Sequence, residues 1–279
     1  MSVSQNKLTL DRVAVHTITC KPMPLEQLCA ALKDRGFGAI SVWREAIEEA
    51  GGTATAKAII KDAGLEATAL VRGGFLPSPD ATERQSAIDE NKRIIDEAAA
   101  INARMVVIVP GAHPEVDLSD ARRMVTDGLG ALTHHAQSAG VGLALEPLHP
   151  MYAGDRSCVN TLKQAREICN QLQSPTVGVA IDVYHTWWDD QLETEIEALG
   201  KQNQIMAFHV CDWLPDTQNR LTDRGLMGDG CIDIPRIRAL VEQAGFSDTV
   251  EVEVIGERYW SLDQNEYLDR IAERCATTT

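Results

Sequence analysis

Four residues whose side chains bind divalent metals stand in, or at the end of, short apolar segments. Glu146 closes Leu-Ala-Leu-Glu, and Asp182 closes Val-Ala-Ile-Asp. His209 lies in Ala-Phe-His-Val, and Glu253 lies in Val-Glu-Val-Glu-Val. Three carboxylates and one imidazole suit Mn²⁺, which we expect, with Mg²⁺, Co²⁺ or Zn²⁺ as alternatives. Because a carboxylate buried at the end of an apolar segment needs a compensating charge, the sequence predicts one divalent metal held by this set of four.

Each of the four also has an ordinary explanation when it is taken alone. A carboxylate at a strand end is often solvated or caps the next helix, and a histidine within an apolar strand is often a hydrogen-bonded core residue. The hypothesis therefore depends on the four occurring together. Glu251 and Glu253 share one face of their strand. We prefer Glu253 as the ligand because it is nearer the carboxyl end, and we expect Glu251 to lie deeper, bonded to a neighbouring side chain.

The elements that must position these residues are indicated by hydrophobic periodicity. Short runs rich in Val, Ile and Ala alternate with longer segments of helical periodicity, as in parallel sheets buried on both faces. The predicted strands are residues 13–18, 39–43, 66–71, 105–109, 142–146, 177–182, 206–211 and 249–254. The predicted helices are residues 25–35, 53–63, 82–100, 119–139, 160–172, 192–199, 234–244 and 265–275, with Ser119 as an N-cap and Gly36, Gly64 and Gly140 as stops.

Eight strand–helix units in 279 residues, without a linker or a low-complexity segment, predict one (β/α)8 TIM barrel domain over residues 1–279. A doubly wound open sheet is the competing α/β architecture, and it usually has a glycine-rich phosphate loop after an early strand. The sequence contains neither G-x-G-x-x-G nor a Walker pattern. In a barrel the reactive face lies at the carboxyl ends of the strands, so ligands from strands five to eight can converge there.

Other side chains near predicted strand ends could bind a substrate. Trp43 and Arg44 follow strand two, Arg72 follows strand three, His113 follows strand four and Trp187 follows strand six. Indole rings suit the C–H face of a sugar, and arginines bind carboxylates or phosphates. The alternatives are loop or subunit packing for the indole rings and pairing with nearby acids for the arginines. Two more tryptophans near the expected mouth are Trp188 and Trp213.

Composition limits the classes of partner. The formal net charge is −15, from 26 Lys+Arg and 41 Asp+Glu, so we expect no nucleic-acid partner. No apolar stretch approaches the roughly eighteen residues of a membrane span, and the first residues lack the apolar core of a secretory signal. We therefore expect a cytoplasmic protein that does not associate with membranes. Seven scattered cysteines without a C-x-x-C pair are expected to be reduced, core-filling thiols.

Several of these segments together resemble the xylose isomerase-like TIM barrels. That group includes ketose 3-epimerases, inosose dehydratases and many proteins described only as sugar phosphate isomerases/epimerases. The resemblance covers nearly the whole chain, and its motifs are specific for the superfamily but not for one reaction. The motifs are Glu146-Pro-Leu-His-Pro, Asp182-x-x-His185, His209-Val-x-Asp212, Arg224-Gly-Leu-Met-Gly-Asp-Gly230 and Glu251-Val-Glu253.

The resemblance implies roles for particular residues. The set of four would hold the metal, and His185 and Arg224 would contact substrate oxygens. Ketose 3-epimerases move the proton with two glutamates, one of which matches Glu253, whereas the other position is Tyr152 here. His149 offers a different base, because its loop resembles that of metal-dependent subunits that cleave or hydrate 3-oxo-glycosides and because histidine titrates near neutral pH. Its alternative role is to order a proline-flanked loop.

These observations predict a divalent-metal-dependent sugar isomerase or epimerase that abstracts a proton next to a carbonyl through a metal-stabilised enediolate, with Glu253, His149 and His185 as catalytic residues. The alternative is a metal-dependent lyase or hydratase of 3-oxo-glycosides that works by β-elimination. The expected partners are a small sugar or sugar derivative, further copies of the chain, and a small second subunit in the case of the lyase. An apurinic endonuclease is disfavoured by the acidic charge and the few histidines, and a non-catalytic barrel is disfavoured by the intact donor set.

Overall fold

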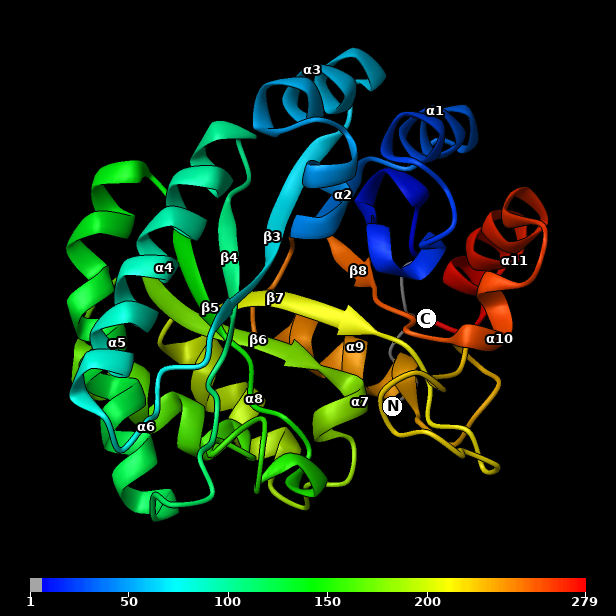
Figure 1. Cartoon of the computed structure of the whole chain (residues 1–279). Helices are drawn as coiled ribbons and strands as arrows, with labels where there is room; N and C mark the ends of the chain where they lie inside the picture. Colours follow the sequence, from blue (N-terminus) through cyan, green and yellow to red (C-terminus); the bar gives the residue numbers. More distant parts are fainter. Residues whose placement is uncertain (1–6) are drawn as a thin grey trace.

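The computed structural model describes residues 7–279, and these residues form a closed barrel of eight parallel strands surrounded by helices (Figure 1). Each strand pairs with its neighbours in sequence, and β1 (Val13–His16) closes the barrel against β8 (Val250–Val252). The predicted (β/α)8 barrel is therefore confirmed. The other strands are β2 (Ala39–Trp43), β3 (Glu66–Gly74), β4 (Met105–Val109), β5 (Gly142–Leu145), β6 (Val177–Asp182) and β7 (Ile205–Val210).

An outer ring of helices covers the barrel (Figure 1). The long helices are α1 (Leu25–Arg35), α3 (Thr53–Ala63), α4 (Ala81–Ala100), α5 (Leu118–Ala139), α6 (Leu162–Leu172), α8 (Leu192–Lys201), α9 (Ile234–Gln243) and α11 (Gln264–Thr277). Short helices that the periodicity did not predict directly follow strand ends or lie in loops. They are α2 (Arg44–Glu49), α7 (Val183–Thr186), α10 (Glu257–Trp260) and the 3-10 turns η1 (Leu10–Arg12), η2 (Thr17–Cys20) and η3 (Pro150–Tyr152).

Side chains alternate across each strand, so every second residue faces the barrel interior. The outward series packs against the helices and forms the main core, whereas the interior has its own smaller cluster. Ala144, Ala180 and Ala207 are fully buried members of that interior cluster. Their small side chains leave space above them at the carboxyl end of the barrel. The next inward-facing positions along the same three strands are Glu146, Asp182 and His209.

Most predicted bounds agree with the structure to within two residues, and the differences have local causes. β1 stops at His16 because the chain turns into the 3-10 helix η2. β3 runs on to Gly74, where a Cβ would lie 1.8 Å from the carbonyl oxygen of Val109, so only glycine allows the pairing. Helix α5 begins at Leu118, which puts Ser119 inside the first turn and corrects the prediction that it is an N-cap.

The structure also bears on the predictions that the cysteines are reduced core residues and that no segment spans a membrane. All seven cysteines are free thiols, and six are buried; Cys231 is exposed, which corrects the prediction that every cysteine fills the core. Among the helices of residues 7–279, none combines the length and the apolar character needed to cross a bilayer.

The barrel–helix core makes a direct prediction about stability. Phe208 of β7 is fully buried and meets the ring of Phe246 edge to face at 6.5 Å between centroids. We expect Phe208→Ala to lower the free energy of unfolding by about 3–5 kcal/mol, because it removes apolar contacts and leaves a cavity. Denaturant unfolding measures this change. Phe75→Ala is the matched control, since Phe75 is 41% exposed, and an equal loss in both variants would contradict the assignment of Phe208 to the core.

A second prediction concerns an ion pair at the amino end of the barrel. Arg104, just before β4, donates to the Asp248 carboxylate near β8 and, from Nη2, to the Thr249 hydroxyl at 3.0 Å. Burial would raise the pKa of Asp248, but hydrogen bonds from Arg104 and the Thr249 N–H outweigh it and hold the pKa below its usual range. The pair therefore stabilises the fold above the unfolded pKa of about 3.9, and this stabilisation is lost as the pH falls through the lower folded value.

We expect Asp248→Asn to lower the free energy of unfolding at neutral pH by only about 0.5–1 kcal/mol, because both partners are partly exposed and screened. The deficit should persist down to about pH 4 and shrink below it, as followed by denaturant unfolding at several pH values. Asp190→Asn, on an exposed aspartate, is the control. A deficit that grows on acidification would refute this account.

Candidate metal centre and active site

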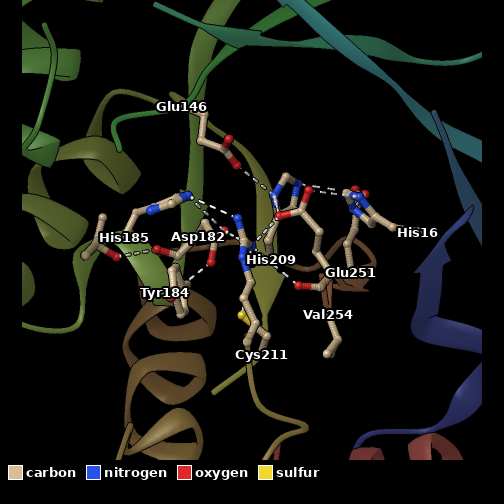
Figure 2. Close-up of polar contacts among 12 residues, drawn as sticks. His16, Glu146, Asp182, Tyr184, His185, His209, Cys211, Glu251 and Val254 are labelled. Carbon is tan, nitrogen blue, oxygen red and sulfur yellow. Dashed lines mark hydrogen bonds and ion pairs between the residues drawn. The ribbon is translucent and has the colours of Figure 1, made fainter. Parts of the chain in front are cut away.

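The carboxyl end of the barrel brings the four predicted ligands together. Asp182 ends β6 and His209 lies in β7, while Glu146 and Glu253 come directly after β5 and β8. Their ligand atoms lie within 4.8 Å of one another, and all four residues are buried. Figure 2 shows Glu146 reaching toward His209, with Asp182 on one side of the group and Glu251 and His16 on the other. Four donors from four successive strands thus converge on one point.

One cation already lies among these carboxylates. Arg224 Nη1 donates to Asp182 Oδ2 at 3.0 Å and to Glu253 Oε2 at 2.8 Å. On the other side of the group, His209 Nδ1 lies 3.0 Å from Glu146 Oε1. Within residues 7–279 the buried Nε2 of His209 has no hydrogen-bond partner. That nitrogen lies 3.9 Å from Glu251 Oε2, whereas Nδ1 faces the set of four. A guanidinium that bridges two of the acids marks a donor set that requires positive charge, and three carboxylates with one imidazole fit a divalent metal.

The ionisation of these side chains reflects their burial and their mutual charges. Burial raises the pKa of Asp182 to about 7 against the opposing effect of Arg224. Burial disfavours the charged form of His209, but its hydrogen bond to Glu146 and the surrounding carboxylates raise its pKa to about 10. Burial would also raise the pKa of Glu253, yet Arg224 and His16 hold that pKa well below its usual range. Glu253 is therefore ionised at neutral pH, while His209 carries a proton that a metal must displace.

Glu251 faces the same interior but lies outside the set of four. Its Oε2 accepts a hydrogen bond from the Thr68 hydroxyl at 3.0 Å and lies 3.1 Å from His16 Nε2. This agrees with the expectation that Glu251 bonds a neighbouring side chain. His16 Nδ1 lies 3.4 Å from Glu253 Oε1 and accepts a hydrogen bond from Trp43 Nε1 at 3.3 Å. His16 therefore links the deeper carboxylate to the one at the mouth.

A small cavity of about 40 Å³ lies over this group. Glu146, His185, Arg224 and Glu253 form part of its wall, together with Tyr152. We call it the inner cavity. His185 Nε2 is 3.4 Å from Arg224 Nη2 and 3.6 Å from Asp182 Oδ2. Burial and the charge of Arg224 lower the pKa of His185 well below its usual value, so this imidazole is neutral at physiological pH.

A larger cavity of about 270 Å³ shares part of its wall with the inner one and is called the outer cavity. Its lining is largely apolar and comes from the loops after β1, β2 and β8 and from the segment around Leu221. The two predicted substrate contacts Trp43 and Arg72 line both cavities. The residues common to the two cavities are Trp43, Arg72, Arg156, Leu221 and Ile255.

Three predicted substrate contacts lie outside the lining of both cavities. Arg44 begins helix α2 and forms ion pairs with Glu90 and Glu97 of α4 at 2.9 and 2.7 Å. It therefore has the alternative role expected for these arginines, pairing with nearby acids. His113 accepts the N–H of Glu115 in a turn after β4. Trp187 packs against the Trp213 ring at 6.0 Å between centroids, as the loop-packing alternative expects.

His149 also lies outside the lining of both cavities. Its ring lies 5.5 Å from that of Trp188 and 5.2 Å from that of Trp213, and its Nδ1 accepts the Met151 N–H at the start of η3. Burial, then the charge of Arg220, lowers its pKa. These contacts fit the alternative role of His149, which is to order the proline-flanked loop.

Three residues at the site were not assigned a function from the sequence. Arg156 lies in a loop without periodicity, so no local pattern could have indicated it. Tyr152 donates its hydroxyl proton to the Arg220 carbonyl at 2.9 Å, as does Tyr184 at 2.8 Å.

Asp212 accepts hydrogen bonds from four backbone N–H groups and so shapes the loop that follows Arg224. The closely spaced glycines of this loop were the sequence feature that could have indicated such a role. The donors are Trp213, Gly228, Gly230 and Ile232.

The comparisons with known proteins agree with this architecture. Residues 29–275 match the family described as xylose isomerase-like TIM barrel. The chain belongs to this family. Within it, the chain is 28% identical to inosose isomerase of Bacillus subtilis (strain 168) over 197 residues, which are 69% of this chain and 68% of the relative.

Two crystal structures are similar to this member of the xylose isomerase-like TIM barrels. Protein SMc04130 from Sinorhizobium meliloti 1021 is 43% identical, with a TM-score of 0.93 and coverage of 97% of this chain and 99% of the other. The IOLI protein, solved with a binding zinc atom, is 22% identical, with a TM-score of 0.81 and coverage of 95% and 96%. The family expected from the motifs is confirmed, and relatives of this chain are named inosose isomerases.

The donor set predicts a measurable metal site. Calorimetric titration of chelator-treated protein with Mn²⁺ should give one ion per chain. Asp182→Asn or Glu146→Gln should weaken binding by about 10–100-fold or more, because each removes one carboxylate donor. Affinity should rise with pH through the neutral range and binding should release protons, since His209 must lose a proton whose pKa is raised to about 10.

Proton release is measured from the binding enthalpy in buffers of different ionisation heat. Glu257→Gln, at an exposed glutamate outside the cavities, removes the same charge and serves as the control. Unchanged stoichiometry and affinity in both ligand variants would rule out this metal site.

Proposed function

We propose that this chain is a divalent-metal-dependent sugar isomerase or epimerase that moves a proton next to a carbonyl through an enediolate. The observation that carries the proposal is the convergence of the set of four ligands beside one cavity, whose wall includes Glu146, Glu253, His185 and Arg224. The names of the inosose isomerases support a cyclic or open-chain polyhydroxy ketone as the substrate class.

The metal has one chemical part in this proposal. A divalent cation on the set of four, which we infer to be Mn²⁺, would polarise the substrate carbonyl and lower the pKa of the adjacent C–H group. The protein supplies binding and proton transfer. Arg224 Nη2 and the neutral imidazole of His185 face each other at 3.4 Å, and both can hydrogen-bond substrate hydroxyl or carbonyl oxygens.

Glu253 is the base that we assign. Its pKa is held well below the usual value, so the carboxylate is ionised at neutral pH, which is the state that a base requires. Arg224 binds Oε2 and His16 lies beside Oε1, and these two contacts fix the orientation of the carboxylate toward the cavity. Positioning of this kind, with a pre-formed donor network, accounts for much of the rate in proton transfer from carbon.

Tyr152 bears on the choice between isomerisation and epimerisation. Epimerisation at one carbon needs a second group that delivers a proton to the opposite face. Tyr152 occupies the position of the second glutamate of ketose 3-epimerases, but its hydroxyl proton is engaged by the Arg220 carbonyl, and burial raises its pKa. This favours transfer of one proton between adjacent carbons by Glu253 on one face, which is isomerisation. The surroundings of His149, outside both cavities, give no support to β-elimination.

The experiment is proton NMR of the Mn²⁺-loaded protein in D₂O with inososes, free ketoses and 3-oxo-glucosides. We expect deuterium next to a ketose carbonyl together with a new isomer. Chelator treatment should abolish the exchange and Mn²⁺ should restore it. Glu253→Gln should reduce the rate by about 10²–10⁴-fold, the usual contribution of a general base.

Two variants sharpen the result. His149→Asn should change the exchange rate by no more than a few-fold, and Glu257→Gln should leave it unchanged. If the protein instead releases the aglycone from a 3-oxo-glucoside, and His149→Asn abolishes this release, the chain is a lyase and the isomerase proposal fails. Full exchange in Glu253→Gln would overturn the assignment of the base.

A further inference from the structure

Two arginines lie where the inner and outer cavities meet. Arg72, in β3, and Arg156, in the loop after η3, line both cavities. The inner cavity is also lined by the ligands Glu146 and Glu253 and by His185, whereas the outer cavity is not. A molecule whose reacting end occupies the inner cavity and whose remainder extends outward must therefore pass these two guanidinium groups.

Neither arginine has a carboxylate partner. Within residues 7–279, no carboxylate oxygen lies within 4.0 Å of either guanidinium. Other partly buried arginines within residues 7–279 have polar partners: Arg166 Nε lies 2.6 Å from Glu195, and Arg122 Nε donates to the Cys158 carbonyl at 2.7 Å. Glu45 also lines the outer cavity, but it forms no ion pair with Arg72. Two unpaired cations at one cavity are unexpected at a net charge of −15 unless an anion binds there.

The two charges are also close enough to repel each other. After burial, the charge of Arg156 is the largest effect that lowers the pKa of Arg72. An anion between the two groups would relieve this repulsion. Planar guanidinium groups bind carboxylate and phosphate oxygens in a bidentate manner, which suits them to this task.

Aromatic rings hold the Arg72 guanidinium without use of its hydrogen-bond donors, and backbone hydrogen bonds hold the main chain of Arg156. The Arg72 guanidinium lies 5.9 Å from the ring centroid of Trp43 and 5.1 Å from that of Phe75. The backbone of Arg156 is fixed at both ends, since its N–H donates to the Tyr152 carbonyl and its carbonyl accepts the Gly111 N–H, each at 3.0 Å. Because its guanidinium is held in this way, Arg72 loses little side-chain entropy when a ligand binds.

We propose that Arg72 and Arg156 form an anion subsite, and that the substrate is a sugar derivative with a carboxylate or a phosphate ester remote from its reacting carbonyl. This inference rests on the proposed isomerase or epimerase function for the identity of the reacting end. The anion subsite selects the substrate by charge, while the set of four and Glu253 act on the carbonyl end.

The test measures binding without reaction. Three ligands that lack a carbonyl are titrated by calorimetry into the Mn²⁺-loaded protein: a hexitol, the corresponding hexitol 6-phosphate and the corresponding hexonate. We expect at least one anionic ligand to bind about tenfold or more tightly than the hexitol. The tighter of the two anionic ligands indicates whether the natural substrate carries a phosphate ester or a carboxylate.

Variants assign the preference to the two arginines. Arg72→Gln and Arg156→Gln should each reduce the anion preference by about tenfold, with hexitol affinity nearly unchanged, and Arg72→Lys should retain part of it. Arg270→Gln, at an exposed arginine on α11, removes the same charge outside the cavities and should keep the full preference. Thermal unfolding checks that each variant is folded.

The outcomes separate this inference from the proposed function. Equal affinity for the three ligands, or a preference that survives in both Gln variants because the anion binds the metal instead, overturns the anion subsite. If neutral ketoses then still exchange deuterium, the proposed function stands without it. If no ketose exchanges deuterium while Arg72→Gln and Arg156→Gln lose anion binding, the anion subsite is supported and the proposed function fails.

Discussion

The site depends on the concentration of negative charge at the mouth of a barrel that is otherwise apolar. Glu146, Asp182 and Glu253 are buried with their ligand atoms within 4.8 Å of one another. Such a group of carboxylates is stable only with a compensating cation. Arg224 supplies part of that charge, and the imidazolium of His209 supplies more. The raised pKa of Asp182 and the depressed pKa of Glu253 both follow from this balance.

The barrel makes this concentration geometrically possible. Parallel strands with a period of two present the same inward position at the same height, so neighbouring strands can each contribute one ligand. The alanines beneath the ligands fill the interior without competing for the space above. Glu251 and His16 form an intermediate layer that connects this apolar interior to the reactive carboxylate of Glu253.

Sequence periodicity was sufficient to predict the barrel and the residues that converge at its mouth, because alternation on a strand determines which side chains share a face; the family was indicated by the resemblance of the motifs. It could not determine the direction of side chains in the connections. Arg44 and Arg72 both follow apolar strands, yet α2 begins at Arg44 and turns it outward to Glu90 and Glu97, whereas Arg72 remains in an extended β3 and faces the cavities. Arg156 and the turn at His149 depend on long-range contacts that no local pattern encodes.

The segment between Asp212 and Arg224 is attached to the barrel at both ends. Asp212 binds the backbone that follows Arg224, and the carbonyl of Arg220 accepts hydrogen bonds from the hydroxyl groups of Tyr152 and Tyr184. This segment contributes Leu221 to the wall of both cavities. The wall is thus tethered to the strands that carry the ligands. Under the proposed function, a wall held in this way would set the distance between the reacting centre and the outer cavity, so that the length of a substrate would contribute to its selection.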